Sequence, residues 1–98
     1  MPTNGIPLTM QGLLWSKNIQ NLDLENDKTY IVHQVLSYGD IADIRWLLEA
    51  YGKDEVAKTF QEFPKKLYQL AVFYFVKDIL LELKDKALNP NEYVRVSP

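Results

Sequence analysis

The chain has 98 residues and a net charge of −2, and 47% of its residues are hydrophobic, 24% charged and 12% aromatic. This is the size of one domain and the composition of a folded globular protein, so a second hydrophobic core and a disordered or fibrous chain are excluded. Cysteine is absent, which excludes disulfides, a thiolate nucleophile and cysteine-ligated zinc.

The first residues carry no sign of export. No basic residue precedes Lys17, and prolines and a glycine interrupt the first seven residues, so the charged and apolar regions of a signal peptide are missing. The longest apolar run, at residues 70–76, is far shorter than the roughly 20 residues needed to cross a bilayer. We therefore expect a cytoplasmic protein without a membrane segment.

The chain divides into three parts by composition. Residues 1–12 predict a flexible N-terminal lead, because two prolines and a glycine stand among small polar residues. Residues 13–88 predict a single helical domain. Residues 89–98 predict a polar C-terminal tail, in which Tyr93 and Val94 suit a short strand or an extended clasp.

Three short helices are predicted within residues 26–63, because apolar residues recur there at helical spacing. Asn26 or Asp27 is the expected N-cap of the first helix and Asp40 that of the second, while Gly39 and Gly52 are the expected stops. The apolar stripes are Ile31, Val35 and Tyr38; then Ile41, Ile44, Leu48 and Tyr51; and then Val56, Phe60 and Phe63.

A longer apolar helix is predicted after Pro64, chiefly over residues 67–83. Almost every face of its first half is apolar, and such a helix lies at the centre of its own bundle or packs against a second chain. Residues 72–76 also suit a buried strand by composition, but the length of the segment favours a helix. The predicted fold is therefore all-α: a compact bundle of three short helices plus one longer apolar C-terminal helix.

No constellation of side chains points to catalysis, to a cofactor or to a metal. His33 is the only histidine, and we expect it to be an ordinary helix-surface or core-edge residue. Asp23, Glu25 and Asp27 alternate like the start of a calcium loop, but the glycine and the bidentate glutamate that such a loop needs further on are missing. We interpret these acids as capping and solvated residues, and we expect no enzyme activity.

Aromatic residues in the C-terminal half give the clearest indication of function. They exceed what one small core needs, and aromatic side chains are frequent anchors of protein interfaces. The sequence predicts a partner or dimer interface formed by Tyr68, Phe73, Tyr74, Phe75 and Leu80. We expect a non-catalytic protein-interaction module that dimerises or binds a partner protein, although the same residues would also fill a core.

The alternative is a helix-turn-helix-like, DNA-binding transcriptional regulator, because the helices on either side of Gly52 have suitable lengths. Its nucleic-acid contacts would be Lys53, Lys58, Lys65 and Lys66. Against this alternative, the second of these helices opens with two acidic residues, which would face the phosphates. Nucleic acid is therefore the less favoured partner.

Residues 14–60 contain an apolar residue before Trp15, an L-D-x-x-x-D-K connector, a V-L-x-x-G-D-x-x-D turn and a Y-G-K-x-x-V stretch. This pattern resembles a small uncharacterised bacterial helical family, often encoded beside nucleotidyltransferase-type toxins of abortive-infection (toxin–antitoxin) systems. The resemblance implies an antitoxin-like or accessory role, with such a toxin as the partner. After Phe63 the chain departs from the pattern. The matching residues are Trp15, Leu22, Asp23, Asp27, Lys28, Val35, Leu36, Gly39, Asp40, Asp43, Trp46, Leu47, Tyr51, Gly52, Lys53 and Val56.

Overall fold

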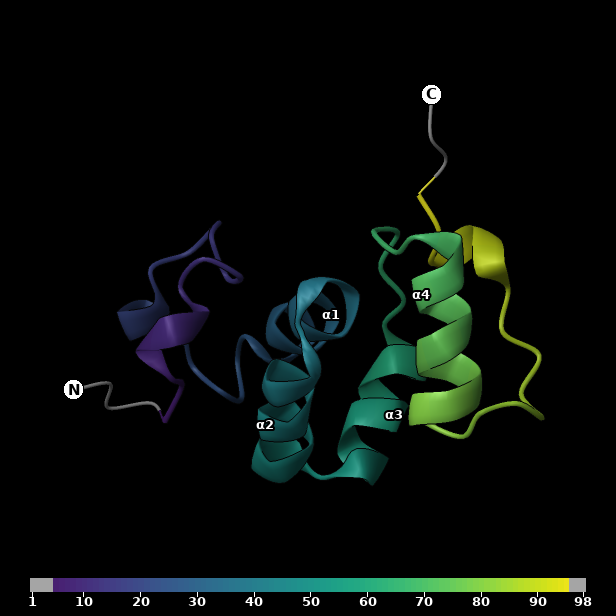
Figure 1. The fold of residues 1–98 in the computed structure, drawn as a ribbon, viewed down its shortest axis with the longest axis horizontal. Coiled ribbons are helices and arrows are strands. Elements are labelled where there is room, and N and C mark those ends of the chain that lie inside the picture. Colours follow the sequence, from purple (N-terminus) through teal and green to yellow (C-terminus); the bar gives the residue numbers. More distant parts are fainter. Residues whose placement is uncertain (1–4, 96–98) are drawn as a thin grey trace.

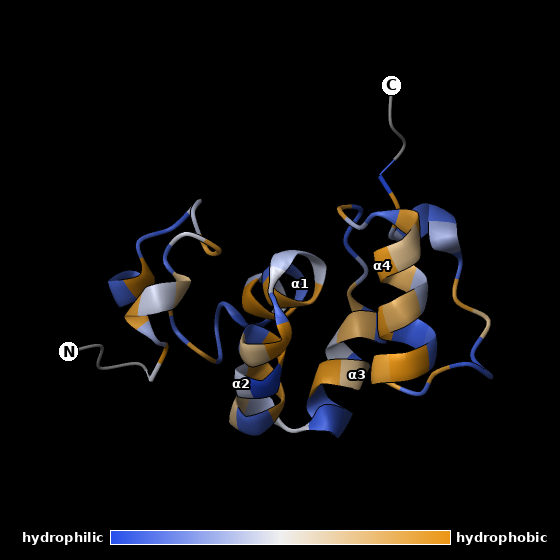
Figure 2. Cartoon of the chain, in the orientation of Figure 1, coloured by the Kyte–Doolittle hydropathy of each residue, from blue (hydrophilic) through white to orange (hydrophobic). Residues whose placement is uncertain are grey.

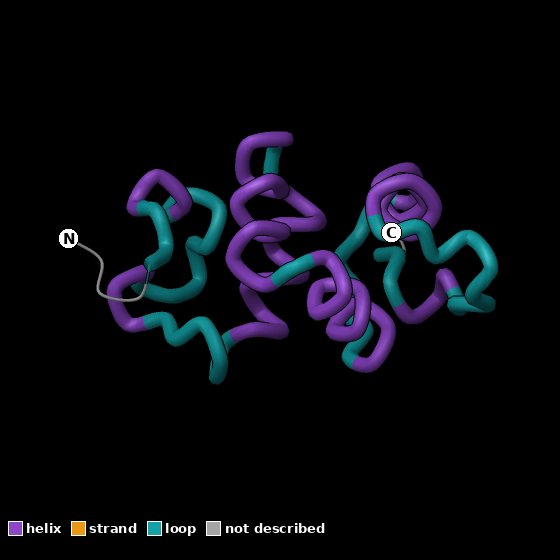
Figure 3. The backbone as a smooth tube through the Cα atoms, turned by 90° about the horizontal axis from the view of Figure 1, so that it is seen from below, coloured by secondary structure: helices purple, strands orange, loops and turns teal. Residues whose placement is uncertain are grey.

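Helices and the loops that join them make up residues 5–95, the part of the chain that the structure, a computed structural model, describes (Figure 1). No strand occurs among these residues (Figure 3), so the predicted compact all-α bundle is confirmed. The α-helices are α1 (Lys28–Tyr38), α2 (Ile41–Tyr51), α3 (Lys53–Glu62) and α4 (Leu70–Tyr74); a π-helix, η3 (Phe75–Leu80), continues α4; and the 3-10 helices are η1 (Leu8–Met10), η2 (Ile19–Asn21) and η4 (Pro90–Glu92).

Helix α1 lies at the centre of the core. All of its residues from 31 to 36 are buried, because α1 contacts both α2 and α3 and also packs against the N-terminal segment. On that side the side-chain amide of Gln34 donates a hydrogen bond of 3.1 Å to the Leu13 carbonyl. The buried residues of α1 thus connect the N-terminal segment to α2 and α3.

The turn between α1 and α2 follows the prediction. The Asp40 carboxylate accepts a hydrogen bond from the Asp43 backbone N–H at 2.9 Å, and the Asp43 carboxylate accepts one from the Asp40 N–H at 3.0 Å. This reciprocal capping box satisfies two N–H groups that a helix start otherwise leaves unpaired. A Cβ at Gly39 would lie 2.6 Å from the Val35 carbonyl oxygen, so the tight turn requires glycine.

Helix α2 follows the prediction in part, because Ile44, Leu48 and Tyr51 of the expected inward stripe are partly buried against the core. The expected inward stripe began at Ile41, but the Ile41 side chain is 77% exposed. Leu47, which lies off that stripe, is the fully buried residue of α2. The reason is that α2 packs on α1 and α3 through its Leu47 side, which leaves part of a second apolar face uncovered.

The segment expected to be a flexible lead contributes to the core over its described part. Ile6, which precedes η1, and Met10, which ends it, are buried and belong to the core cluster. Gln11 holds the following loop, because its carboxamide accepts a hydrogen bond from the Ile19 N–H at 2.8 Å and donates one to the Lys17 carbonyl at 2.9 Å. Residues 1–4 lie outside the described residues.

The predicted long C-terminal helix is shorter than expected. Helical structure covers only residues 70–80, as α4 and η3, which equals the length of α1 or α2. Residues 72–76 are helical, so the strand alternative is wrong. The helix starts late because Tyr68 pairs with the C-terminal segment in a parallel bridge to Val94: the Tyr68 N–H donates to the Tyr93 carbonyl at 2.8 Å, and the Arg95 N–H donates to the Tyr68 carbonyl at 2.9 Å.

Residues 89–95, which we term the C-terminal clasp, complete the core beside α3 and α4. The Tyr93 ring lies 4.6 Å from that of Phe60 and 4.9 Å from that of Phe73, between ring centroids. The Tyr93 hydroxyl donates a hydrogen bond of 2.7 Å to the Phe60 carbonyl. Aromatic side chains distant in sequence thereby join α3, α4 and the clasp in one buried cluster.

Candidate interaction surface

One face of α4 and η3 carries large apolar side chains that the chain itself does not cover. Leu70, Tyr74, Phe75 and Ile79 are 55%, 42%, 47% and 65% exposed. We call these four residues the α4–η3 stripe. Apolar colouring covers much of this helical segment (Figure 2).

The π-helical geometry of η3 aligns the stripe. Leu70 and Tyr74 are four residues apart, which is about one turn of α-helix. Tyr74 and Ile79 are five residues apart, which is about one turn of a π-helix. The backbone follows this change, because the Leu81 N–H donates to the Val76 carbonyl five residues earlier, at 2.9 Å. With this wider turn Ile79 follows Tyr74 on the exposed side of the helical segment.

The structure divides the predicted interface residues between the surface and the core. Tyr74 and Phe75 lie on the α4–η3 stripe, whereas Tyr68 and Phe73 are fully buried. Phe73 stacks on Phe60, and the ring edge of Tyr68 meets Phe60 at 5.7 Å between centroids. Tyr68 and Phe73 are thus core residues in this chain. The sequence did not indicate Leu70 and Ile79: Leu70 lies in a segment that is apolar on nearly every side, and the place of Ile79 depends on the π-turn.

Leu80, the fifth predicted residue, lines a separate apolar groove. The groove has a volume of about 330 Å³ and opens to solvent between α2 and the end of η3. We call it the α2–η3 groove; its lining residues are Ile41, Ile44, Arg45, Leu48, Glu49 and Leu80. Its floor is apolar, and its two charges both come from α2.

The lysines proposed for nucleic acid have acidic neighbours. Lys53 forms an ion pair of 2.8 Å with Glu82, and its hydrogen bond lowers the pKa of the Glu82 carboxyl. Lys58 shares a shallow pocket with Asp54 and with further polar residues of α3. These acids weaken the positive field that binding to phosphates requires. Lys65 and Lys66 are exposed in the connection between α3 and α4.

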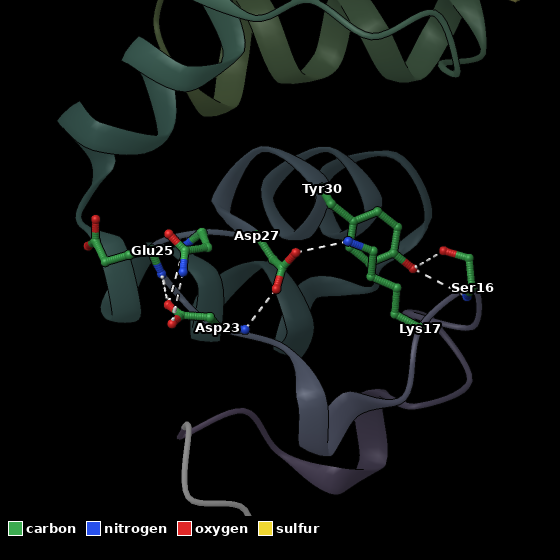
Figure 4. Close-up of polar contacts among 7 residues, drawn as sticks. Ser16, Lys17, Asp23, Glu25, Asp27 and Tyr30 are labelled. Carbon is green, nitrogen blue, oxygen red and sulfur yellow. Dashed lines mark hydrogen bonds and ion pairs between the residues drawn. The ribbon is translucent and has the colours of Figure 1, made fainter.

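The acidic segment before α1 is engaged in internal hydrogen bonds (Figure 4). The Asp23 carboxylate accepts from the N–H groups of Glu25 and Asn26 at 2.7 and 3.2 Å. The Asp27 carboxylate accepts from the Asp23 N–H and from Lys17 Nζ, both at 2.9 Å, and the Lys17 hydrogen bond lowers the pKa of Asp27. Asp27 occupies the N-cap position of α1 without capping it, because its carboxylate is used by these two donors.

His33 is more deeply buried than predicted, at 1% exposure. Its Nε2 lies 2.6 Å from the Phe63 carbonyl and its Nδ1 lies 2.7 Å from the Tyr68 hydroxyl. Because a carbonyl can only accept, Nε2 carries the proton and Nδ1 accepts from Tyr68. Burial lowers the pKa of His33 to about 4, so the ring is neutral and joins α1 to the connection between α3 and α4.

No cluster of three or more histidine, aspartate or glutamate side chains within residues 5–95 is arranged to bind a metal ion. None of the helices in the same range has the length and apolarity that a bilayer crossing requires.

Comparisons with known proteins match the N-terminal and central part of the chain. A sequence profile described as a family of unknown function (DUF6922) covers residues 10–60, which is just over half of the 98 residues. Neither a curated protein nor a solved structure matches the chain. The matched range includes the α2 side of the α2–η3 groove and ends before the α4–η3 stripe.

Proposed function

We propose that the chain, which belongs to the family of unknown function DUF6922, is a non-catalytic protein-interaction module. In this proposal a partner protein packs on the α4–η3 stripe, and the chain acts as an antitoxin-like or accessory protein. The mechanism is burial of apolar surface without any chemical step. A nucleotidyltransferase-type toxin is the proposed partner, and the resemblance of residues 14–60 to proteins encoded beside such toxins is what suggests it.

The observation that supports the proposal is the exposure of four large apolar side chains on one short helical face. Together they expose roughly 300 to 400 Å², which is about the size of the largest apolar patch on a typical monomer, and such a patch is often an interaction site. Covering roughly 300 Å² of apolar surface would contribute roughly 7 kcal/mol before the costs of association. Tyr74 and Phe75 also supply the aromatic anchors that dominate many interfaces.

The α4–η3 stripe lies over a closely packed part of the core. Phe73 lies between the stripe residues in sequence and is fully buried, where it contacts Phe60 and Tyr93. The hydroxyl of Tyr93 further ties the clasp to α3. A rigid, preorganised face loses less conformational freedom on binding than a mobile one.

A photoreactive amino acid at position 79 tests the proposal in cells. We expect a covalent adduct with a second protein, identified by mass spectrometry, and we expect Phe75→Asp in the same chain to abolish it. Phe75 is half exposed, so this substitution leaves the core intact.

Position 8 provides the matched control, because Leu8 is also apolar and 50% exposed but lies in η1. The same photoreactive residue there is expected to give no adduct with that protein. Three outcomes would contradict the proposed function. Position 79 could give no adduct, it could give adducts made only of two copies of this chain, or both positions could give equal adducts with the second protein.

A further inference from the structure

We propose that a second copy of this chain occupies the α2–η3 groove, with the two α2 helices running antiparallel about a two-fold axis. This goes beyond the proposed function, which concerns the α4–η3 stripe, and it does not depend on it. The inference rests on the pattern of apolar and charged residues along α2.

The α2 residues of the groove form a continuous line along the helix. They stand at i, i+3, i+4, i+7 and i+8, which is the spacing of one helical face that packs on another element. Leu47 is buried in the core, and Ile44 and Leu48 are partly buried against it. The part of this face that is open to a second chain therefore follows Ile41, Arg45 and Glu49. Its first residue, Ile41, is 77% exposed, and the face is completed by Ile44, Arg45, Leu48 and Glu49.

The two charges of the groove have no ion-pair partner within residues 5–95. Arg45 and Glu49 are one helical turn, about 6 Å, apart along the axis, yet the structure gives no ion pair between them or to any other described residue. Their order agrees with this, because a base placed before an acid at i, i+4 pairs less well than the reverse. Both charges are therefore available to a ligand.

An antiparallel second copy satisfies both charges at once. Rotation about a two-fold axis between positions 45 and 49 places Arg45 of each copy opposite Glu49 of the other, which gives two identical ion pairs. A contact of this kind is isologous, since the same patch serves on both copies. The guanidinium of arginine is well suited to a carboxylate at an interface, and antiparallel helices also oppose their dipoles favourably.

The same arrangement covers the middle of the apolar floor: the axis lies at the level of position 47, so Leu48 of one copy lies beside Leu48 of the other. An occupant that pairs both charges has to offer an acid and a base one turn apart, in reverse order, together with apolar side chains. The α2 helix itself presents this combination, with Ile41 and Leu48 beside the two charges. The groove is thus complementary to its own copy, and this identifies the occupant.

Sedimentation velocity of the full chain from micromolar to submillimolar concentration, at low salt, tests the inference. We expect the wild type to be in monomer–dimer equilibrium. Arg45→Glu and Glu49→Arg each create two like-charge contacts per dimer, so each is expected to raise the dissociation constant about tenfold or more. The double variant Arg45→Glu/Glu49→Arg restores both pairs and is expected to return to within about twofold of the wild type.

Mixing the two single variants gives a second readout. A chain with two acids and a chain with two bases form two attractive pairs with each other, so the mixture is expected to dimerise where each variant alone stays monomeric. Lys58→Glu reverses a charge on α3 outside the groove and serves as the control, with no expected change. The inference would be overturned if the wild type stayed monomeric at all concentrations, or if the double variant dimerised as weakly as the single variants. Either result would leave the expected cross-linking from position 79 unchanged.

Discussion

At the scale of single residues, His33 has the most demanding environment. Both ring nitrogens are hydrogen-bonded in a buried site, where the neutral ring accepts from the Tyr68 hydroxyl and donates to the Phe63 carbonyl. The protonated ring would have to donate from Nδ1 towards the Tyr68 hydroxyl while losing most of its hydration. Burial is the main cause of the low pKa of His33, about 4. Protonation of the ring in the folded chain is therefore unfavourable at neutral pH.

Acid should therefore destabilise the fold through His33. The pKa is about 4 in the folded chain and about 6.5 in the unfolded chain, so the unfolded state takes up the proton first as the pH falls. The stability that the neutral His33 ring contributes to the folded state is fully present above pH 6.5 and is lost as the pH falls towards 4. Between pH 7 and pH 5 we expect a loss of about 2 kcal/mol in the free energy of unfolding.

Urea unfolding at a series of pH values measures this loss. His33→Gln is the control, because it removes the titrating ring while keeping a polar side chain. This variant should be less stable than the wild type at pH 7. Its free energy of unfolding should change less with pH between pH 7 and pH 5. Parallel curves for the two proteins would show that His33 does not cause the acid sensitivity.

At the scale of elements, the sequence predicted those features that local chemistry determines. Gly39 and Asp40 mark the α1–α2 turn because a stop and a capping box are built from neighbouring residues. The exposed face of α2 was not predictable, since Ile41 and Leu47 are both apolar and only the packing of α1 and α3 decides which one is buried. The start of α4 likewise depends on the pairing of Tyr68 with residues 93–95, a contact between segments far apart in the sequence.

The candidate surface was half predictable for the same reason. Composition pointed to the C-terminal helical segment, and of the five residues predicted for an interface Tyr74 and Phe75 lie exposed on it. A segment that is apolar on nearly every side gives no sequence signal for its outward face. The π-turn that adds Ile79 is also absent from residue spacing, because it follows from the backbone hydrogen bonds.

The C-terminal clasp should contribute much of the stability of the α3–α4 pair. Tyr93 is 1% exposed and packs on two other rings, so Tyr93→Ala is expected to cost about 3 to 5 kcal/mol. Tyr93→Phe keeps the ring but leaves the Phe60 carbonyl without its hydroxyl donor, at a cost of about 1 kcal/mol.

Thermal and urea unfolding would check this order. Tyr74→Ala is the matched control, because it removes a tyrosine ring from the exposed stripe of the same region and should cost less than about 1 kcal/mol. Equal losses for Tyr93→Ala and Tyr74→Ala would contradict the role assigned to the clasp.

At the scale of the whole molecule, the two proposed contacts use different parts of the chain. The groove lies between α2 and the end of η3, whereas the stripe follows the exposed face of α4 and η3. A dimer formed through the groove would thus carry two stripes. Two binding faces on one particle increase the apparent affinity for a partner that is itself multivalent.

The two contacts should therefore be separable by mutation. Phe75→Asp is expected to leave the dimer dissociation constant unchanged within about twofold, while Arg45→Glu is expected to leave the single-site affinity for the cross-linked partner unchanged. Light scattering of the purified complex should give two chains with two partners for the wild type and one with one for Arg45→Glu. Dissociation of the dimer by Phe75→Asp would show instead that the stripe and the groove form one interface.

The position of Tyr93 also has a consequence for synthesis. Its ring covers Phe60 and Phe73, yet it leaves the ribosome later than either of them because translation proceeds towards the C-terminus. Until then a nascent chain presents uncovered aromatic surface, the kind of feature that chaperones recognise. A chain that lacks residue 93 therefore leaves the rings of Phe60 and Phe73 uncovered, and we expect it to aggregate more readily than the wild type.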